Sequence, residues 1–210
     1  MRTELYFVRH GESEANRLGV LAGHEDLLLT DVGHAQAALC AERLRSVPFA
    51  AIYTSDLTRA VQTAAPHEVL HGIPAVRTAA LREFDAGLWT GRAYAAIATE
   101  YPELYPRVWE ESFGLLEPPG GEALTAAAER LFTFVSEVSA RHAGQALLFV
   151  THAGILRAFW GKLMGIDPSE LSRRLPFATN ASYSLAVCED GVLRPLLYGQ
   201  TADVRGAENA

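Results

Sequence analysis

The feature that most constrains the fold is an alternation of short apolar runs with longer amphipathic stretches. The apolar runs have the length and side-chain character of strands, and they cover Glu4–Val8, Ala50–Thr54, Val76–Leu81 and Gln145–Thr151. The stretches with helical periodicity are Asp31–Ser46, Asp56–Ala65, Glu122–His142 and Ile155–Met164. Pro66 is expected to end the second of these helices. Alternating strands and helices predict an α/β fold, with three α/β/α layers and a mostly parallel sheet.

Two parts of the chain depart from this alternation. The β-type runs Tyr183–Cys188 and Val192–Leu197 flank Glu189-Asp190-Gly191, which is a hairpin signal and predicts one antiparallel strand at an edge of the sheet. Prolines interrupt the stretch of about residues 92–120, so we expect short helices there, forming a small helical cap insert over one end of the sheet. With that insert, residues 1–210 are expected to form a single domain.

Charge and cysteine usage narrow the function classes. Eighteen Lys and Arg against 25 Asp and Glu give a net charge of −7, which argues against nucleic acid or an anionic membrane as a partner. No apolar run has the length of a signal peptide or a membrane-spanning helix. Cys40 and Cys188 form no Cys-x-x-Cys pair, so we expect two free thiols in a reducing cytoplasm. A homodimer paired through an edge strand stays open.

The residues that follow the four apolar runs are the candidates for chemistry. Ligands of open α/β sheets bind beyond the carboxyl ends of the strands, where these residues would meet. The segments in question are Arg9-His10-Gly11, Ser55–Arg59, Arg82-Glu83 and Thr151-His152-Ala153-Gly154. Together they bring histidines, arginines and a glutamate to one edge of the sheet, which is the set that hydrolysis of an anionic ester would need.

Arginine beside histidine at the end of the first run indicates an anion site. His10 can be a nucleophile, a base, a metal ligand or a turn residue. The Arg9 guanidinium would disfavour the protonated form of His10 and offer paired donors to a phosphate. Arg59 lies in the first turn of a helix, where anions bind. Its alternative is a surface pairing with Asp56.

Three further residues complete the candidate set, each with a structural alternative. A protonated His152 would neutralise phosphate oxygens, or else it is a satisfied core histidine. Aromatic neighbours would raise the pKa of Glu83 and suit it to donate a proton, or else it is a surface carboxylate. Asn16 would donate a hydrogen bond to the same ligand, or else it is an ordinary polar residue. The remaining histidines are expected at the surface, and they are His24, His34, His67, His71 and His142.

Taken in order, these segments resemble the histidine phosphatase superfamily, in its phosphoglycerate-mutase-like branch. The resemblance rests on the Arg-His-Gly signature and on five further motifs in the family's order. The matching segments are Val8–Asn16, Ser55–Ala64, Leu81–Gly91, Pro119–Ala123, Val150–Gly154 and Asn180–Ser182. They span nearly the whole chain, and their combination is far more specific than the tripeptide alone.

The resemblance implies phosphoryl transfer in two steps. His10 would attack phosphorus to form a phosphohistidine, which water would then hydrolyse. Glu83 would protonate the leaving oxygen and then act as a base toward water. The groups that would hold the phosphate oxygens are those of Arg9, Asn16, Arg59, His152 and Ala153. Because these groups supply positive charge and donors, no metal or other cofactor is expected.

The segment after Glu83 separates phosphatases from mutases. Cofactor-dependent mutases of the family carry Glu-Arg-His-Tyr-Gly there and a paired arginine further on. Here Glu83 is followed by Phe-Asp-Ala-Gly-Leu-Trp, and residues 92–120 contain no Arg-Arg pair. This pattern is more similar to small-molecule phosphatases, including the α-ribazole-phosphate and broad-specificity groups. We therefore predict a metal-independent phosphomonoesterase that acts on small phosphorylated metabolites.

Three alternatives stay open: a cofactor-dependent phosphoglycerate mutase, a non-catalytic phosphate-binding protein, and a metallohydrolase that uses His10 and His152. The departures from the family pattern at Ala22 and Thr90 bear on substrate identity rather than on the phosphoryl chemistry. The aromatic residues of the insert either stack on a substrate ring or form the insert's own small core, which we expect. These residues are Tyr94, Tyr101, Tyr105, Trp109 and Phe113.

Overall fold

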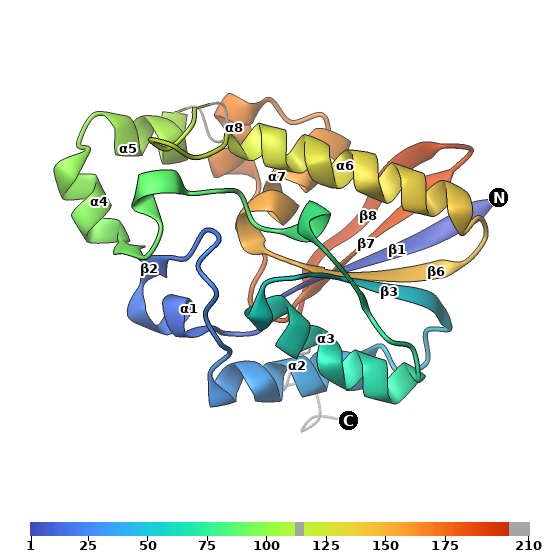
Figure 1. Cartoon of the computed structure of the whole chain (residues 1–210). Coiled ribbons are helices and arrows are strands. Elements are labelled where there is room, and N and C mark those ends of the chain that lie inside the picture. Colours follow the sequence, from blue (N-terminus) through green and yellow to red (C-terminus); the bar gives the residue numbers. More distant parts are fainter. Residues whose placement is uncertain (112–115, 202–210) are drawn as a thin grey trace, which may run out of the picture.

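The computed structural model of the chain describes residues 1–111 and 116–201. The described residues form a six-stranded mixed sheet in the order β4-β3-β6-β1-β7-β8 (Figure 1). Its strands are β1 (Arg2–Arg9), β3 (Phe49–Ser55), β4 (Val76–Thr78), β6 (Ala146–Thr151), β7 (Tyr183–Glu189) and β8 (Val192–Gln200). The predicted run Val76–Leu81 is a strand over its first half only, because Ala79–Leu81 form a 3₁₀ turn, η1.

The predicted mostly parallel sheet is confirmed. Strands β4, β3, β6 and β1 run in parallel, β7 pairs antiparallel with β1, and β8 pairs antiparallel with β7. The predicted hairpin is therefore present, with Asp190 and Gly191 both at positive φ in its turn. Its strands differ from the prediction in one respect, since the antiparallel strand β7 lies one place inside the edge and β8 forms the edge.

Helices cover both faces of the sheet, as the three-layer prediction requires (Figure 1). One face carries α6 (Leu124–Arg141) and α7 (Ala153–Leu163), and the other carries α2 (Asp31–Arg43) and α3 (Thr58–His71). Successive residues of β1 serve opposite layers: Phe7 packs with the α6 and α7 cluster and Val8 with the α2 and α3 cluster. All six residues of β6 are buried, which explains why that strand reads as a continuous apolar run.

The predicted end of α3 at Pro66 is wrong. The helix continues through Pro66 to His71 and ends at Gly72, whose φ of 67° suits a glycine. Proline removes one backbone hydrogen bond from the helix interior. The helix continues because residues on both sides of the proline, Ala64 and His67, are fully buried.

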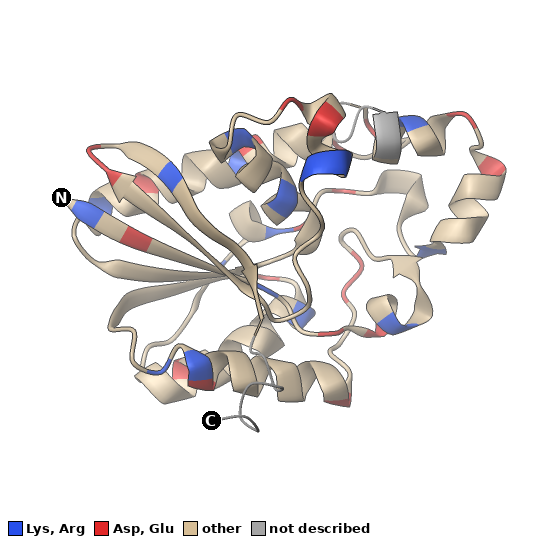
Figure 2. Ribbon diagram, turned by 180° about the vertical axis from the view of Figure 1, so that it is seen from behind, with Lys and Arg blue, Asp and Glu red and all other residues tan. Residues whose placement is uncertain are grey.

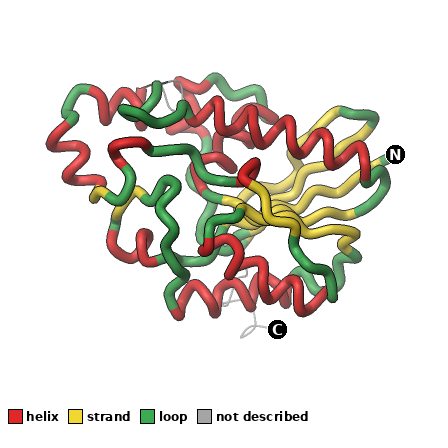
Figure 3. Tube along the Cα trace, in the orientation of Figure 1, coloured by secondary structure: helices red, strands yellow, loops and turns green. Residues whose placement is uncertain are grey.

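The chain between β4 and α6 lies beyond the carboxyl ends of the parallel strands (Figure 3). It contains short elements, as expected: η2 (Gly87–Trp89), β5 (Arg92–Ala93), α4 (Tyr94–Glu100), α5 (Leu104–Pro106) and the π-helical turn η3 (Arg107–Glu111). Strand β5 pairs with β2 (Val20–Leu21), which follows α1 (Glu14–Leu18). Four aromatic residues of this segment pack together, as the ring-centroid distances of 5.6 Å for Trp89–Tyr101 and 6.3 Å for Tyr105–Trp109 show. Phe113 lies outside the described residues.

Acidic and basic residues are interspersed along the ribbon (Figure 2). Within the described part of the chain, no helix combines the length and hydropathy of a membrane-crossing segment.

Candidate active site

His10 follows the last residue of β1 and is 5% exposed. Its Nδ1 lies 2.7 Å from the Gly11 carbonyl oxygen, so Nδ1–H donates to that oxygen and the lone pair on Nε2 is left for other chemistry. Burial, and then the charges of Arg59 and Arg9, hold the pKa of His10 well below its ordinary value. His10 is therefore a neutral imidazole in a fixed orientation, with one ring nitrogen available as a nucleophile.

The glycine after His10 is required by close packing. A Cβ at Gly11 would lie 2.4 Å from the carbonyl oxygen of Gly33, in the first turn of α2. The Arg-His-Gly turn and this helix therefore meet backbone to backbone, and a larger residue at either position would push the His10 turn away.

His152 lies beside His10 because β1 and β6 are parallel neighbours. The two imidazole centroids are 5.1 Å apart. His152 is fully buried, its Nδ1 accepts a hydrogen bond from Nε of Arg59 at 3.2 Å, and its Nε2 lies 2.8 Å from Oγ of Ser55. Burial, and then Arg59, hold its pKa well below the ordinary value, so this His152 is neutral. The sequence suggested a protonated His152. In the site without a ligand, the structure instead favours the neutral form.

Arg59 enters the site from the first turn of α3 and is 1% exposed. Besides His152, its guanidinium donates to the carbonyl oxygens of Glu25 at 2.7 Å and Gly23 at 2.8 Å. These contacts use three of the five N–H groups and leave two for a ligand. The alternative pairing with Asp56 is wrong, because Asp56 accepts two hydrogen bonds from Arg82.

Arg9 and Asn16 supply further donors. One Nη1–H of Arg9 donates to the Ala178 carbonyl at 2.6 Å, and its Nε is buried with no hydrogen-bond partner among the described residues. Oδ1 of Asn16 accepts from the Ser13 N–H and from Nδ2 of Asn180, both at 3.1 Å. This orientation leaves the Asn16 amide nitrogen as a possible donor to a ligand.

Glu83 reaches the N-terminus of α7. Its carboxylate accepts hydrogen bonds from the N–H groups of Gly154 at 2.9 Å, Ile155 at 2.8 Å and Phe84 at 3.1 Å. A Cβ at Gly154 would lie 2.8 Å from Oε1 of Glu83, so the glycine permits this approach. The sequence predicted an apolar environment for Glu83, whereas its oxygens have polar backbone partners. The first residue of α7, Ala153, borders the same cavity as Glu83.

A second set of residues fixes the loop that carries Glu83, and sequence reasoning missed it. Nη1 of Arg130 donates to the carbonyl oxygens of Ala79, Ala80 and Arg82, just before Glu83. Its Nη2 donates to Oε1 of Glu122 at 2.7 Å. The same Glu122 oxygen accepts the N–H of Asp85. The signal was the Pro-Gly-Gly-Glu segment, since a Cβ at Gly121 would lie 2.3 Å from the Asp85 carbonyl oxygen. His24, expected at the surface, is half-buried with Nε2 2.7 Å from the Glu83 carbonyl oxygen.

The segment of residues 175–178, which follows α8 (Pro168–Arg174), is held in place by Arg157. No sequence motif pointed to this arginine. Its Nε donates to the Leu175 carbonyl at 2.6 Å, and its guanidinium lies 4.3 Å from the ring centroid of Phe177. Tyr198 holds the same segment, accepting from the Ala178 N–H at 3.1 Å. These contacts position the Ala178 carbonyl that binds Arg9.

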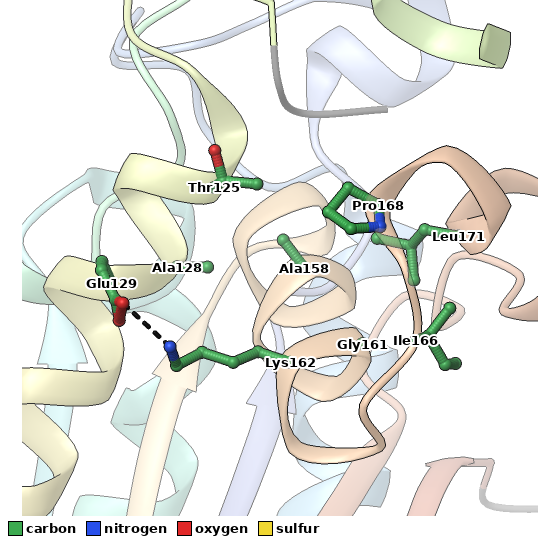
Figure 4. A pocket seen from close by; sticks show the side chains of 9 residues that line it. All are labelled: Thr125, Ala128, Glu129, Ala158, Gly161, Lys162, Ile166, Pro168 and Leu171. Carbon is green, nitrogen blue, oxygen red and sulfur yellow. Dashed lines mark hydrogen bonds and ion pairs between the residues drawn. The ribbon is translucent and has the colours of Figure 1, made fainter. Parts of the chain in front are cut away.

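A cavity of about 170 Å³ opens beside these groups. Of the candidate residues, Arg9, Glu83 and Ala153 line it, whereas His10, Asn16, Arg59 and His152 do not. It is lined by Arg9, Leu21, Glu83, Phe84, Tyr94, Trp109, Ala153, Gly154 and Phe177. A larger hollow of about 250 Å³ lies between α6, α7 and α8 (Pro168–Arg174), where the Glu129–Lys162 ion pair closes at 2.8 Å (Figure 4). None of the strand-end residues lines that hollow, so the smaller cavity is the candidate active site. Within residues 1–111 and 116–201, no group of three or more His, Cys, Asp or Glu could hold a metal ion.

Known proteins resemble this chain over most of its length. The chain is 34% identical over 188 residues to phosphoserine phosphatase 1 of Hydrogenobacter thermophilus, a match that covers 89% of this chain and 87% of that protein. It is also 34% identical over 178 residues to 2,3-bisphosphoglycerate-dependent phosphoglycerate mutase 2 of Gloeobacter violaceus, covering 80% of this chain and 79% of the relative. A mycobacterial glucosyl-3-phosphoglycerate phosphatase superposes with a TM-score of 0.86 at 25% identity, covering 96% of this chain and 100% of that one.

The family model described as histidine phosphatase superfamily (branch 1) matches residues 5–201, from the strand that carries His10 to the end of the sheet. A match of this extent means that the chain belongs to the histidine phosphatase superfamily, branch 1, as a phosphoric monoester hydrolase.

Proposed function

We propose that this protein hydrolyses small phosphorylated metabolites without a metal ion, through a phosphohistidine intermediate on His10. The observation that carries the proposal is the neutral, oriented ring of His10, whose Nδ1 is committed to Gly11 and whose Nε2 is not. Nε2 attacks phosphorus as the bond to the leaving oxygen breaks. Splitting the reaction through a covalent intermediate is ordinary nucleophilic catalysis.

Arginine charge takes the place of a metal ion in this proposal. The unengaged N–H groups of Arg9 and Arg59 hold two phosphate oxygens, and the amide of Asn16 and the backbone N–H of Ala153 add neutral donors. Phosphoryl transfer depends mainly on positioning and on charge stabilisation, which fixed guanidinium groups provide in a buried site.

His152 is proposed to gain a proton when the substrate binds. An incoming phosphate dianion favours the protonated form of a neighbouring imidazole, and so offsets the burial and the Arg59 charge that keep His152 neutral. Protonation at Nδ1 breaks the hydrogen bond from Nε of Arg59, and the new Nδ1–H then donates to a phosphate oxygen as negative charge develops.

Glu83 is proposed as the proton carrier for both steps. In the first step its carboxylic acid gives a proton to the leaving alkoxide, and His10 becomes phosphorylated. In the second step the Glu83 carboxylate takes a proton from water as the water oxygen attacks phosphorus and the N–P bond breaks. The products are an alcohol, inorganic phosphate and the original enzyme. The position of Glu83 on the cavity wall with Arg9 supports this role.

The test is phosphate release from p-nitrophenyl phosphate and sugar phosphates in excess chelator, with His10→Ala as the blank. We expect turnover in chelator, no turnover in the blank, and acid-labile phosphate on the wild-type protein after rapid quenching. Activity that chelator abolishes and zinc restores would contradict metal independence. Conversion of 3-phosphoglycerate to 2-phosphoglycerate with little phosphate release would identify a mutase instead.

A further inference from the structure

The candidate active site continues into an apolar chamber that phosphate chemistry does not use. Beside the polar end at Arg9, Glu83, Ala153 and Gly154, the rest of the described lining is one aliphatic and four aromatic side chains. These are Leu21, Phe84, Tyr94, Trp109 and Phe177. They come from β2, the Glu83 loop, α4, η3 and the segment after α8, so widely separated parts of the chain converge on this chamber.

We propose that this chamber binds the leaving group, and that the protein prefers phosphomonoesters of ring-bearing apolar alcohols over esters whose leaving group carries a carboxylate. The proposal rests on the proposed hydrolysis at His10 and adds the class of alcohol that is released.

The walls of the chamber are arranged before any ligand arrives. The Phe84 and Trp109 rings meet at 72° with centroids 6.0 Å apart, and Tyr94 meets Trp109 at 71° and 6.2 Å. Phe177 lies under the Arg157 guanidinium at 4.3 Å. Rings that meet edge to face form a corner, in which a flat ligand can stack on one ring and contact the edge of another.

Two of the aromatic residues that line the chamber are unusually exposed to solvent. Tyr94 is 40% exposed and Phe177 is 42% exposed, and they are the only aromatic residues among the exposed large hydrophobic residues of the described chain. Both line this cavity. An apolar group that entered the chamber would remove these surfaces from water, which is a favourable change in proportion to the area buried.

The charges in the chamber disfavour a second anionic group. Arg9 is the only cation among the described lining residues, and it lies at the phosphate end. Burial, and then the charge of Glu83, raise the pKa of Tyr94 to about 12, so that wall is neutral. A carboxylate on the leaving group would lose water against aromatic rings and face Glu83 without a cation of its own. Phosphoserine and 3-phosphoglycerate are therefore expected to be poor substrates, although similar proteins are named for activity on phosphoserine and on phosphoglycerate.

The size of the cavity fits a single ring. Its volume is about 170 Å³. An engineered apolar cavity of about 150 Å³ in another protein accommodates benzene. A phenyl or similar ring would take up nearly all of this volume, whereas a nucleotide would protrude.

The test compares benzyl phosphate, ethyl phosphate and O-phosphoserine. All three have primary alkyl leaving groups, so differences in kcat/KM report recognition more than leaving-group chemistry. We expect benzyl phosphate to exceed ethyl phosphate by at least about 10-fold, from the burial of a ring, and phosphoserine to fall below both. The benzyl-to-ethyl ratio should drop toward one in Phe177→Ala and Tyr94→Ala. It should stay unchanged in the control Leu39→Ala, which removes an exposed apolar residue of α2 outside the cavity.

Binding of benzylphosphonate and ethylphosphonate, measured by calorimetry, separates failure of this inference from failure of the proposed hydrolysis. Tighter benzylphosphonate binding without turnover of any ester would uphold the chamber and overturn the hydrolysis. Turnover with equal kcat/KM for the benzyl and ethyl esters, or with phosphoserine preferred, would overturn the chamber and uphold the hydrolysis. Equal or undetectable binding of the two phosphonates would also overturn the chamber.

Discussion

His10 and His152 follow neighbouring strands and are both neutral, yet their ring nitrogens are engaged differently. His10 uses only Nδ1, on its own turn, whereas His152 uses one nitrogen on Arg59 and the other on Ser55. The ring with a free nitrogen can attack phosphorus, and the ring with two partners orients Arg59. The two partners of His152 come from the end of β3 and the start of α3, so the difference depends on tertiary structure.

Glu83→Gln tests proton donation to the leaving group. Glutamine keeps the shape of the side chain but cannot give up a proton, and a positioned general acid contributes typically 10²- to 10⁴-fold. We expect ethyl phosphate hydrolysis to fall by about 10³-fold and p-nitrophenyl phosphate hydrolysis by about tenfold or less, because nitrophenolate leaves without protonation. The measurement is kcat/KM for both esters. Equal losses for the two esters would show that Glu83 does not protonate the leaving oxygen.

Most residue types at the site could be predicted from the sequence because His10, Glu83 and His152 lie just after apolar runs. Their partners were not readable. The ion pair of Asp56 goes to Arg82 rather than to Arg59, and the Glu83 oxygens bind backbone N–H groups of α7. Both outcomes depend on where loops from other strands lie, which the local pattern around Arg59 or Glu83 does not contain.

At the scale of elements, α6 and the Glu83 loop form one unit through Arg130. Its side chain bridges loop carbonyls, including that of Glu83, and Glu122, so Arg130 is a positioning residue that does not itself line the cavity. Arg130→Met should release the loop and misplace the Glu83 carboxyl. We expect kcat for ethyl phosphate to fall by about tenfold with KM nearly unchanged, and p-nitrophenyl phosphate to be affected less.

The matched control for Arg130→Met is Arg141→Met, near the end of the same helix and outside the loop contacts. It should leave both esters unaffected. If Arg130→Met instead lowered the turnover of both esters equally, or raised only KM, the arginine would stabilise the fold without orienting Glu83.

Helix α3 carries a buried histidine, His67, so its predicted surface position is wrong. The pKa of this histidine couples stability to pH. His67 is fully buried, its ring nitrogens have no hydrogen-bond partner among the described residues, and burial, and then His71, lower its pKa to about 4. The unfolded chain binds a proton at this residue near pH 6.5 and the folded chain does not. Stability therefore rises with pH between about 4 and 6.5, and His67 alone accounts for about 3 kcal/mol across that window.

His67→Leu removes that proton while keeping an apolar side chain of similar volume. We expect the free energy of unfolding, from denaturant titrations at pH 4.5, 5.5 and 7, to depend less on pH in this variant than in the wild type. His34→Leu, at an exposed position in α2, is the control and should retain the wild-type slope. Identical slopes for the wild type and His67→Leu would mean that His67 is protonated in the folded protein.

The element pattern predicted the strands well and one helix end poorly. The six strands of the main sheet meet the predicted ranges to within three residues, and β6 reads as a continuous apolar run because it is buried along its whole length. Pro66 is a local signal for a helix end, and the packing of Ala64 and His67 against the sheet outweighs it. The local rule that proline ends a helix failed at Pro66 because burial of the neighbouring residues stabilises the helix by more than the proline destabilises it.

For the whole molecule, the sequence predicted where the site lies but not its apolar chamber. Parallel strands necessarily gather their carboxyl ends at one edge, so His10, His152 and Glu83 could be brought together from topology alone. Phe177 and Trp109 line the chamber because the insert and the segment after α8 fold back over that edge. Neither segment carries a motif that marks it for this position.

Phosphate binding should stabilise the whole molecule through the smaller cavity, because its donors come from strands and helices in separate parts of the chain. At 100 times its Kd, inorganic phosphate should raise the free energy of unfolding by about 2.7 kcal/mol, a Tm increase of roughly 5–10 °C in a chain of this size. Arg9→Met should abolish most of the increase. Lys162→Met, in the larger hollow of Figure 4, should retain it. Thermal unfolding of both variants with and without phosphate is the measurement. If Lys162→Met lost the increase and Arg9→Met kept it, the anion would bind between α6 and α8 rather than at the ends of β1 and β6.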